Sequence, residues 1–401
     1  MMSSILSWQG LSNLVGLVET DFENGPTTSQ ALLRLFGHTE SDVRVTLYRD
    51  THGWCPYCHK VWLWLEERRV PYRVRKVTMF CYGEKDHWYK KICPTGMLPA
   101  LELDGRLITE SDIMLHNLEK EFGPVGTDMH DPQIGILLKL ERQIFYAWCG
   151  WLCYPSRNIT EENERKMNFI NSAHVVDKAL GSTQGPYFLS EYSTADIVFI
   201  PYLERMNATL FYYKGFNLKN VSTFPRLWKW FDALETREAY RGTQSDFHTH
   251  CHDLPCLMGG CYESGEEHQQ KCKKRIDSCN DFNLPETIIK EPEDSKHIAL
   301  EKVLRHWARI LRVNPVENID EPLRVALTYM MTGQLEAISD GTEIGLRYIR
   351  DRVCVPRDMP IWSARRFRQA LEVVASTVSS SQGPPLSLIH RRDQDPKPFR
   401  Y

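Results

Sequence analysis

Residues 45–124 alternate between the two-residue hydrophobic period of strands and the longer period of helices. Short apolar or alternating runs predict strands at 45–48, 72–75, 100–103 and 106–109. Amphipathic runs predict one helix after residue 58, another over 86–91 and a third from 111 to 122. Asp104-Gly105 suits the two-residue turn of a hairpin between the last two strands. The resulting order, βαβ, helix, hairpin and helix, fits a small α/β sandwich.

The pattern becomes helical alone between residues 131 and 244. Residues 131–154 form a long apolar run rich in aromatic side chains, and Ser193-Thr194-Ala195-Asp196 resembles the capping box of a following helix. We expect the aromatic side chains to pack a core, with the lining of a hydrophobic substrate site as the alternative. Cys149 and Cys153 share one helix face at i and i+4. They are either a second redox pair or, as we expect, two small buried residues.

The remaining regions differ in how regular their patterns are. Residues 246–290 contain many Cys and His residues, which suggests zinc, but no pair has the C-x₂-C spacing of a zinc ribbon. We therefore predict no metal site there and a linker instead. An amphipathic pattern resumes over 291–378 and predicts a helical extension. We expect residues 1–44 to form a weakly ordered lead-in and residues 379–401 to form a loose tail.

Composition narrows the functional classes. The 401 residues are 42% hydrophobic and 25% charged, which is typical of a soluble globular protein with domains of about 100–200 residues. A net charge of −3 supplies no basic field for nucleic acid. No apolar run approaches the ~18–20 residues of a membrane span, so we predict no membrane partner. The 12 cysteines are too few for a disulfide scaffold and indicate a reduced compartment.

The candidate chemistry lies at Cys55-Pro56-Tyr57-Cys58, between the first predicted strand and the first predicted helix. A helix N-terminus stabilises a thiolate through its partial positive charge and free backbone N–H groups. We therefore expect Cys55 to be a nucleophile near neutral pH, with Cys58 placed to attack a mixed disulfide on it. A structural zinc half-site and an inert buried pair are the alternatives. The strand–CxxC–helix context favours redox or thiol-transfer chemistry.

Two further motifs accompany this one. They are Gly96-Met97-Leu98-Pro99-Ala100-Leu101 and Thr109-Glu110-Ser111-Asp112. Together the motifs resemble those of the cysteine-type glutathione transferases, with omega- and lambda-like features. The resemblance implies an α/β thioredoxin-like domain over 45–124, followed by an all-α glutathione transferase C-terminal domain over 131–245.

The resemblance also implies a binding site for glutathione as co-substrate, with no metal. In that family the proline of the second motif follows a cis peptide bond, so Leu98 and Pro99 would form a backbone clamp for the cysteinyl part of glutathione. Glu110 and Ser111 would hold its γ-glutamyl end. Cys55 would face the glutathione sulfur, with Cys58 as the second catalytic candidate.

Lys85 completes the set implied by the resemblance. It stands three residues before Trp88, as a lysine does in the omega-class pattern. Lys85 would therefore contact the glycyl carboxylate of glutathione, with Tyr57 beside it. A second cysteine at position 58 is more typical of glutaredoxins, so dithiol chemistry is also open.

The C-terminal region refines the resemblance. Together with the N-terminal block, the segment from Leu346 to Met359 looks like the iota class, which carries CPYC and a helical extension. We expect an enzyme that transfers thiols in the manner of a glutaredoxin, with small or protein-bound disulfides or dehydroascorbate as substrates. A non-catalytic protein that binds glutathione conjugates is the alternative. The extension is expected to be a regulatory or docking module for a protein partner, and the location cytoplasmic or, alternatively, plastidic.

Overall fold

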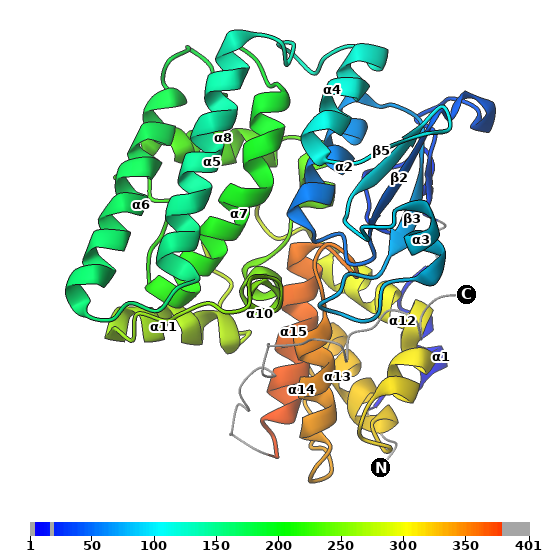
Figure 1. The fold of residues 1–401 in the computed structure, drawn as a ribbon. Helices are drawn as coiled ribbons and strands as arrows, with labels where there is room; N and C mark the ends of the chain where they lie inside the picture. The colour runs from blue at the N-terminus through cyan, green and yellow to red at the C-terminus, as the bar shows by residue number, and fades with distance from the viewer. Residues whose placement is uncertain (1–4, 17–19, 379–401) are drawn as a thin grey trace.

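The computed structural model describes residues 5–16 and 20–378 (Figure 1). Its sheet has the strand order β1-β3-β2-β4-β5. The strands are β1 (Leu33–Arg34), β2 (Val45–Asp50), β3 (Tyr72–Val77), β4 (Ala100–Leu103) and β5 (Arg106–Ile108). β2 runs parallel to β3, and the other neighbours are antiparallel. The predicted thioredoxin-like α/β domain is confirmed, including the hairpin between β4 and β5.

The helices of this domain are α2 (Pro56–Arg68), α3 (His87–Ile92) and α4 (Ser111–Phe122). Pro56 opens α2 at a position where the missing N–H has no intrahelical partner to lose. Arg69 ends the helix in the left-handed conformation, with φ 54° and ψ 43°. Most of α2 is buried because α7 (Thr194–Lys214), a helix of the second domain, packs against it (Figure 1).

The second domain is helical, as predicted. It contains α5 (Pro132–Leu152), α6 (Ile159–Ala179), α7 (Thr194–Lys214), α8 (Pro225–Glu235) and α9 (Glu238–Thr243). Every residue of α7 is buried, so this helix forms the centre of the domain. The capping box is present: the Ser193 backbone N–H donates to Asp196 Oδ2 at 3.0 Å, and Trp230 Nε1 donates to Asp196 Oδ1 at 2.8 Å. Asp196 is thus a structural residue.

The region expected to be a linker forms two helices instead. They are α10 (Phe247–Met258) and α11 (Glu267–Asp277), and both pack against α7. The linker prediction for 246–290 is therefore wrong in this part. His248, His250 and His252 belong to the Cys- and His-rich stretch that suggests zinc, but all three are buried in α10. A histidine with a buried hydrogen-bond partner packs as a core residue, which hides the helical pattern.

The predicted helical extension is present and has a core of its own. It contains α12 (Ser295–Val313), α13 (Asp320–Thr332), α14 (Glu343–Arg352) and α15 (Ile361–Ala375), and it lies below the α/β domain in Figure 1. α1 (Trp8–Ser12), from the other end of the chain, joins this core. The Trp8 ring stacks on Trp307 with centroids 4.5 Å apart, and Trp8 Nε1 donates to Asp320 Oδ1 at 2.8 Å.

The lead-in expected to be weakly ordered is therefore structured where the structure describes it. α1 packs on the extension, and β1 forms the edge strand of the sheet. Both elements are short and depend on distant partners, which explains why their own sequences gave no signal. None of the described helices is long and apolar enough to cross a membrane. The tail predicted for 379–401 lies outside the described residues.

Candidate active site

The register of the sheet brings the predicted motifs to one edge. Asp50 at the end of β2 pairs with Val77 at the end of β3, and Tyr48 pairs with Ala100 at the start of β4. β5 ends opposite the start of β4. The loops at this edge carry Cys55-Pro56-Tyr57-Cys58, Lys85, Leu98-Pro99 and Glu110-Ser111. Residues far apart in the sequence thus meet because of strand direction alone.

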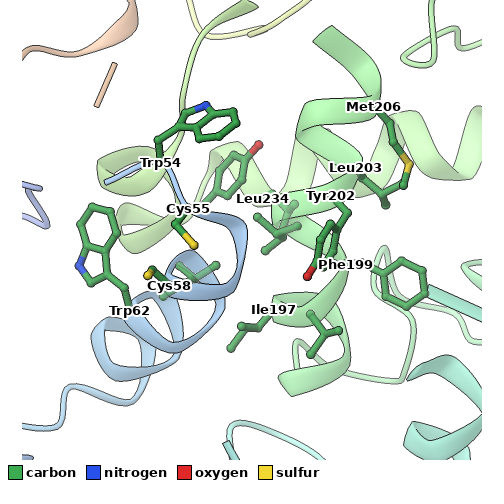
Figure 2. Packing of buried hydrophobic residues seen from close by; sticks show 14 of the residues in the cluster. Trp54, Cys55, Cys58, Trp62, Ile197, Phe199, Tyr202, Leu203, Met206 and Leu234 are labelled. Carbon is green, nitrogen blue, oxygen red and sulfur yellow. The ribbon is translucent and has the colours of Figure 1, made fainter. Parts of the chain in front are cut away.

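The two cysteines of the motif lie at the start of α2, with Cys55 as its N-cap residue. Cys55 is 6% exposed and Cys58 1%, so Cys55 is the more accessible of the two. Figure 2 shows the two sulfur atoms close together, near the rings of Trp54 and Trp62. The side chains of α7, among them Tyr202, lie on the facing side. Cys55 is therefore at the interface between the two domains.

The two thiols differ in acidity. A hydrogen bond from the Cys58 thiol, with help from the backbone N–H groups of Cys58 and Tyr57, lowers the pKa of Cys55 in spite of its burial. Burial, together with the hydrogen bond to Cys55, raises the pKa of Cys58 well above that of an ordinary thiol. The negative charge therefore resides on Cys55, and Cys58 keeps its proton. This is the asymmetry expected of a nucleophile at a helix N-terminus.

The residue before the nucleophile is held by groups that sequence analysis did not find. The Trp54 backbone N–H donates to Asp50 Oδ2 at 2.7 Å, and its carbonyl oxygen accepts from the Arg205 guanidinium. The Arg205 guanidinium also lies over the Trp54 ring, 4.8 Å from the centroid. The Trp54 indole Nε1 donates to His250 Nδ1 at 3.1 Å. α7 and α10 therefore fix the backbone next to Cys55.

The imidazole of His250 is neutral in this arrangement. An indole nitrogen only donates, so His250 Nδ1 must accept. Burial lowers the pKa of His250 and of His59, and burial raises the pKa of Glu204 to about 8. The Glu204 carboxyl lies between these rings, with Oε2 3.7 Å from His250 Nε2 and 4.0 Å from His59 Nδ1. His250, His59 and Glu204 are thus uncharged near neutral pH.

The second motif has the geometry expected of it. The Leu98–Pro99 peptide bond is cis, as predicted. Pro99 is buried, whereas Leu98 is only partly buried. A cis bond turns the chain sharply before β4 and leaves the backbone of Leu98 at the same edge of the sheet as Cys55. Its role as a clamp remains a prediction.

The third motif opens α4. Glu110 is exposed and adopts a positive φ of 66°, which is uncommon for a residue with a side chain. Ser111 is the first residue of the helix and is buried. Lys60 Nζ lies 2.6 Å from Asp112 Oδ1 and so joins α2 to the first turn of α4. The free N–H groups of this turn form a natural site for a carboxylate.

Lys85 and Tyr57 flank these motifs. Lys85 is partly buried and close to the clamp loop, because a Cβ placed on Gly96 would lie 3.7 Å from Lys85 Cε. Burial lowers the pKa of Lys85, while the negative charge at the cysteine pair acts in the opposite direction. Tyr57 is 40% exposed, and its ring meets Tyr202 edge-on at 6.0 Å. A cation and an exposed ring therefore border the space next to Cys55.

The helical extension contacts the elements that hold the Cys55 loop. The loop between α14 and α15 contacts α10, where the Val355 backbone N–H donates to Thr249 Oγ1 at 3.1 Å and Ser245 Oγ donates to the Val355 carbonyl. On its other side, Ser29 Oγ donates to the Pro356 carbonyl at 2.8 Å. Thr249 immediately precedes His250, so the loop between α14 and α15 contacts the helix whose His250 accepts the hydrogen bond of Trp54.

A metal centre has little to form around in this structure. Among residues 5–16 and 20–378, the side chains of His, Cys, Asp and Glu form no group of three or more that could hold a metal ion. The site instead combines an acidic thiol, a helix N-terminus, an exposed carboxylate and a cation. This set suits a zwitterionic thiol ligand with carboxylates at both ends.

Comparison with known families agrees with this geometry. Residues 54–121 match the family described as "Glutathione S-transferase, N-terminal domain", and residues 133–243 match "Glutathione S-transferase, C-terminal domain". These two segments are therefore similar in sequence to the two domains of glutathione S-transferases. The match includes Cys55-Pro56-Tyr57-Cys58, whereas α10, α11 and the extension lie outside it.

Curated relatives match about half of the chain. The chain is 26% identical over 197 residues to glutathione S-transferase DHAR2 of Arabidopsis thaliana, which spans 49% of this chain and 86% of the relative. It is 25% identical over 199 residues to glutathione S-transferase L3 of the same plant, which spans 48% of this chain and 79% of the relative. A likeness restricted to this half says nothing of the extension.

Solved structures give weaker matches. Glutathione transferase Omega 3C from Trametes versicolor is 26% identical, with a TM-score of 0.44, and covers 51% of this chain and 90% of its own. Dehydroascorbate reductase from Chlamydomonas reinhardtii is 18% identical, with a TM-score of 0.41, and covers 50% of this chain and 93% of its own.

Proposed function

We propose that the protein is a glutathione-dependent thiol transferase or reductase that works through a mixed disulfide on Cys55. The observation that carries the proposal is the state of Cys55, which caps α2 and has a pKa below that of an ordinary thiol. A tyrosine- or serine-type transferase would activate the glutathione thiol with a hydroxyl, but a cysteine thiolate in that position can attack a glutathione mixed disulfide and take over its glutathionyl group, releasing the other thiol. The relatives named DHAR support a reductase of this type.

Glutathione would bind along the edge of the sheet that holds the motifs. The backbone of Leu98 before Pro99 would pair with the cysteinyl part of glutathione. Glu110 would accept its α-ammonium group, and Ser111 with the N–H groups of α4 would bind the α-carboxylate. Lys85, beside Tyr57, would neutralise the glycyl carboxylate. Each part of the ligand thus meets a group of opposite charge or polarity.

The chemical cycle has two steps. The Cys55 thiolate attacks the glutathionyl sulfur of a mixed disulfide, so a Cys55–glutathione disulfide forms and the substrate leaves as a thiolate that takes a proton. A second glutathione thiolate then attacks the glutathionyl sulfur, releases glutathione disulfide and restores the Cys55 thiolate. Reduction of dehydroascorbate uses the same balance, because two glutathione thiols supply its two electrons and two protons.

The high pKa of Cys58 favours the version with a single catalytic thiol. A thiol that keeps its proton is a slow nucleophile, but it is a good hydrogen-bond donor to the neighbouring thiolate. Cys58 would therefore tune Cys55 more than it resolves the mixed disulfide. Attack by Cys58 on Cys55 is the dithiol alternative.

A thiol-transfer assay with glutathione and a small mixed disulfide tests the proposal. Cys55→Ser should abolish turnover, whereas Cys58→Ser should retain it. Equal loss in both variants would establish an obligatory dithiol cycle. Tight glutathione binding with no turnover in the unaltered protein would instead support the non-catalytic binding protein.

Finer assignments belong to the same proposal. The segment from Leu346 to Met359 and the helical extension favour the iota class. The proposed substrates are small or protein-bound disulfides, and the proposed location is the cytoplasm or the plastid. The extension would receive a protein partner, since Ile344 of α14 and Leu335 of the segment before it are exposed.

A further inference from the structure

A second group of cysteines lies where the end of α5 meets the segment between α10 and α11. Cys153 caps the C-terminus of α5, and Cys149 stands one turn earlier on the same helix. Cys261 comes from the segment between α10 and α11, far along the chain. All three are free thiols, and all three are partly exposed. Small oxidants in solution can therefore reach them.

The backbone fixes Cys261 beside Cys153. The Tyr262 backbone N–H donates to the Leu152 carbonyl at 2.9 Å. That carbonyl belongs to the peptide unit of residues 152 and 153, and that N–H belongs to the unit of residues 261 and 262. The peptide unit next to Cys153 is therefore hydrogen-bonded to the peptide unit next to Cys261, and this bond holds the two cysteines close together. A second backbone hydrogen bond, from the Ser264 N–H to the Tyr213 carbonyl at 2.9 Å, fixes the same segment against α7.

The thiols are hydrogen-bonded in a row. The hydrogen bond to Cys153, with burial, raises the pKa of Cys149 far above that of an ordinary thiol. Cys149 in turn lowers the pKa of Cys153, but the hydrogen bond to Cys261 and burial outweigh this effect and raise it to about 12. The protons therefore stay on Cys149 and Cys153, and Cys261 is the acceptor at the end of the row.

Two alternative roles fit the group less well. A metal site needs three or more ligands converging on one point, and the described part of the chain has no such group. A purely structural role would suit fully buried thiols such as Cys251, but these three are partly exposed. The backbone hydrogen bond from Tyr262 to Leu152 brings Cys261 and Cys153 together from two chain segments, and a disulfide needs such close backbones.

We propose that Cys153 and Cys261 form a redox-sensitive dithiol, which a low-molecular-weight disulfide such as glutathione disulfide oxidises to an intramolecular disulfide. The Cys261 thiolate attacks glutathione disulfide, so a Cys261–glutathione disulfide forms and one glutathione leaves. Cys153 loses its proton and attacks Cys261 Sγ, which breaks that bond and releases a second glutathione. Two protein thiols are oxidised, and one glutathione disulfide is reduced to two glutathione molecules.

The expected disulfide would join the end of α5 to the segment that follows α10. It would therefore restrain both helices that meet there, and α10 is the helix whose His250 holds Trp54. The hydrogen bond of Cys149 is to Cys153 of the same chain segment, so Cys149 would remain a thiol. It provides a matched control on the same helix face.

The test uses the full-length protein with Cys55→Ser, so that the proposed transferase cycle cannot contribute. The protein is equilibrated in mixtures of glutathione and glutathione disulfide, quenched with acid, alkylated and analysed by peptide mass spectrometry. In excess glutathione disulfide we expect a peptide that joins Cys153 to Cys261, lighter by two hydrogens than its separate parts, and an alkylated Cys149. Thermal melting confirms that each variant is folded.

Variants decide which sulfur atoms take part. Cys153→Ser should abolish the cross-linked peptide and leave Cys261 as a glutathione mixed disulfide, whereas Cys149→Ser should leave the cross-link intact. Alkylation of all three residues in excess glutathione disulfide would overturn the proposal, and so would a cross-link between Cys149 and Cys153. Neither result bears on the proposed transferase function, because Cys55 is absent throughout.

Discussion

The protein has two thiol clusters, Cys55 with Cys58 and Cys153 with its neighbours Cys149 and Cys261. The first stands at the N-terminus of a helix and the second at the C-terminus of another, and their acidities differ accordingly. Cys55 caps the N-terminus of α2, where a hydrogen-bonded thiol and backbone N–H groups lower its pKa. Cys153 caps the C-terminus of α5, where free carbonyl groups offer no such help, and its pKa is raised to about 12. The first cluster is therefore suited to rapid turnover, and the second to slow oxidation that persists.

The two clusters also differ in the charged groups and N–H groups that surround them. Lys85, Glu110 and the first turn of α4 offer charges and N–H groups near Cys55. Near Cys153 the side chains of Trp151 and Leu152 are buried in the hydrophobic core, and Lys214 is already paired with Glu162 at 2.8 Å. Under the proposed function, glutathione would bind at the first cluster, whereas the second would react only with disulfides that collide with it.

The largest expected effect is the loss of the nucleophile. Cys55→Ser should lower the rate of thiol transfer by a factor on the order of 10³ or more, because a serine hydroxyl is not a thiolate at neutral pH. Cys153→Ser should change the same rate by less than about twofold. Steady-state kinetics with a small mixed disulfide measures both. A comparable loss in Cys153→Ser would show that the second cluster takes part in turnover and would break the comparison.

The next effect concerns pH. At pH 7 a thiol with a pKa of about 12 is ionised to about one part in 10⁵, whereas an ordinary thiol is ionised to about one part in 10². We therefore expect iodoacetamide to alkylate Cys55 at least about 10²-fold faster than Cys153 at pH 7. The thiolate fraction rises with pH, so the Cys55 rate should level off at a lower pH than the Cys153 rate. Peptide mass spectrometry over pH 5–10 follows both residues, and parallel profiles would contradict the assigned acidities.

A third effect tests whether only the first cluster has a glutathione site. Glu110→Gln should raise the Michaelis constant for glutathione by about 10–100-fold, since a hydrogen bond to a charged group contributes about 1.5–3 kcal/mol. The constant for the disulfide substrate should change far less. As a control, oxidation of Cys153 and Cys261 by glutathione disulfide should not change in this variant. Unaltered glutathione affinity would show that Glu110 does not hold the γ-glutamyl end.

Sequence patterns predicted the parts of the site that depend on residues close together in the sequence. Cys55-Pro56-Tyr57-Cys58 needs only a strand before it and a helix after it, and the cis bond at Pro99 follows from the motif around it. The same local reasoning predicted the hairpin at Asp104-Gly105 and the capping box at Ser193. Each of these features depends on residues close in sequence, so short patterns are sufficient to predict it.

The parts that could not be predicted depend on distant contacts. Arg205 and His250 reach Trp54 from 151 and 196 residues further along the chain, and no spacing rule connects them. The Glu204-Arg205 pair within the mostly apolar sequence of α7 was the available signal, because a buried charge needs a partner. The stacking of Trp8 on Trp307 is a similar case, since it joins the two ends of the chain.

The smallest expected effect tests how the catalytic loop is held. In His250→Phe the buried Trp54 Nε1–H loses its acceptor, which costs about 1–3 kcal/mol. Part of that cost should fall on the placement of Cys55, so we expect the turnover number to fall by about 3–10-fold. The pH at which Cys55 alkylation levels off should shift with it, a readout that a loss of overall stability would not move.

Two matched variants separate positioning from folding. His250→Gln restores an acceptor and should recover most of the turnover. His252→Phe alters a buried histidine of the same helix that bonds Asp277 instead, with Nε2 3.0 Å from Oδ1, and should leave the Cys55 profile unchanged. If His252→Phe shifted the profile as much as His250→Phe, α10 would act on the site only as a packed helix. An effect specific to His250 would instead make the α2 cluster dependent on one contact from α10, a support that the cysteines of α5 do not have.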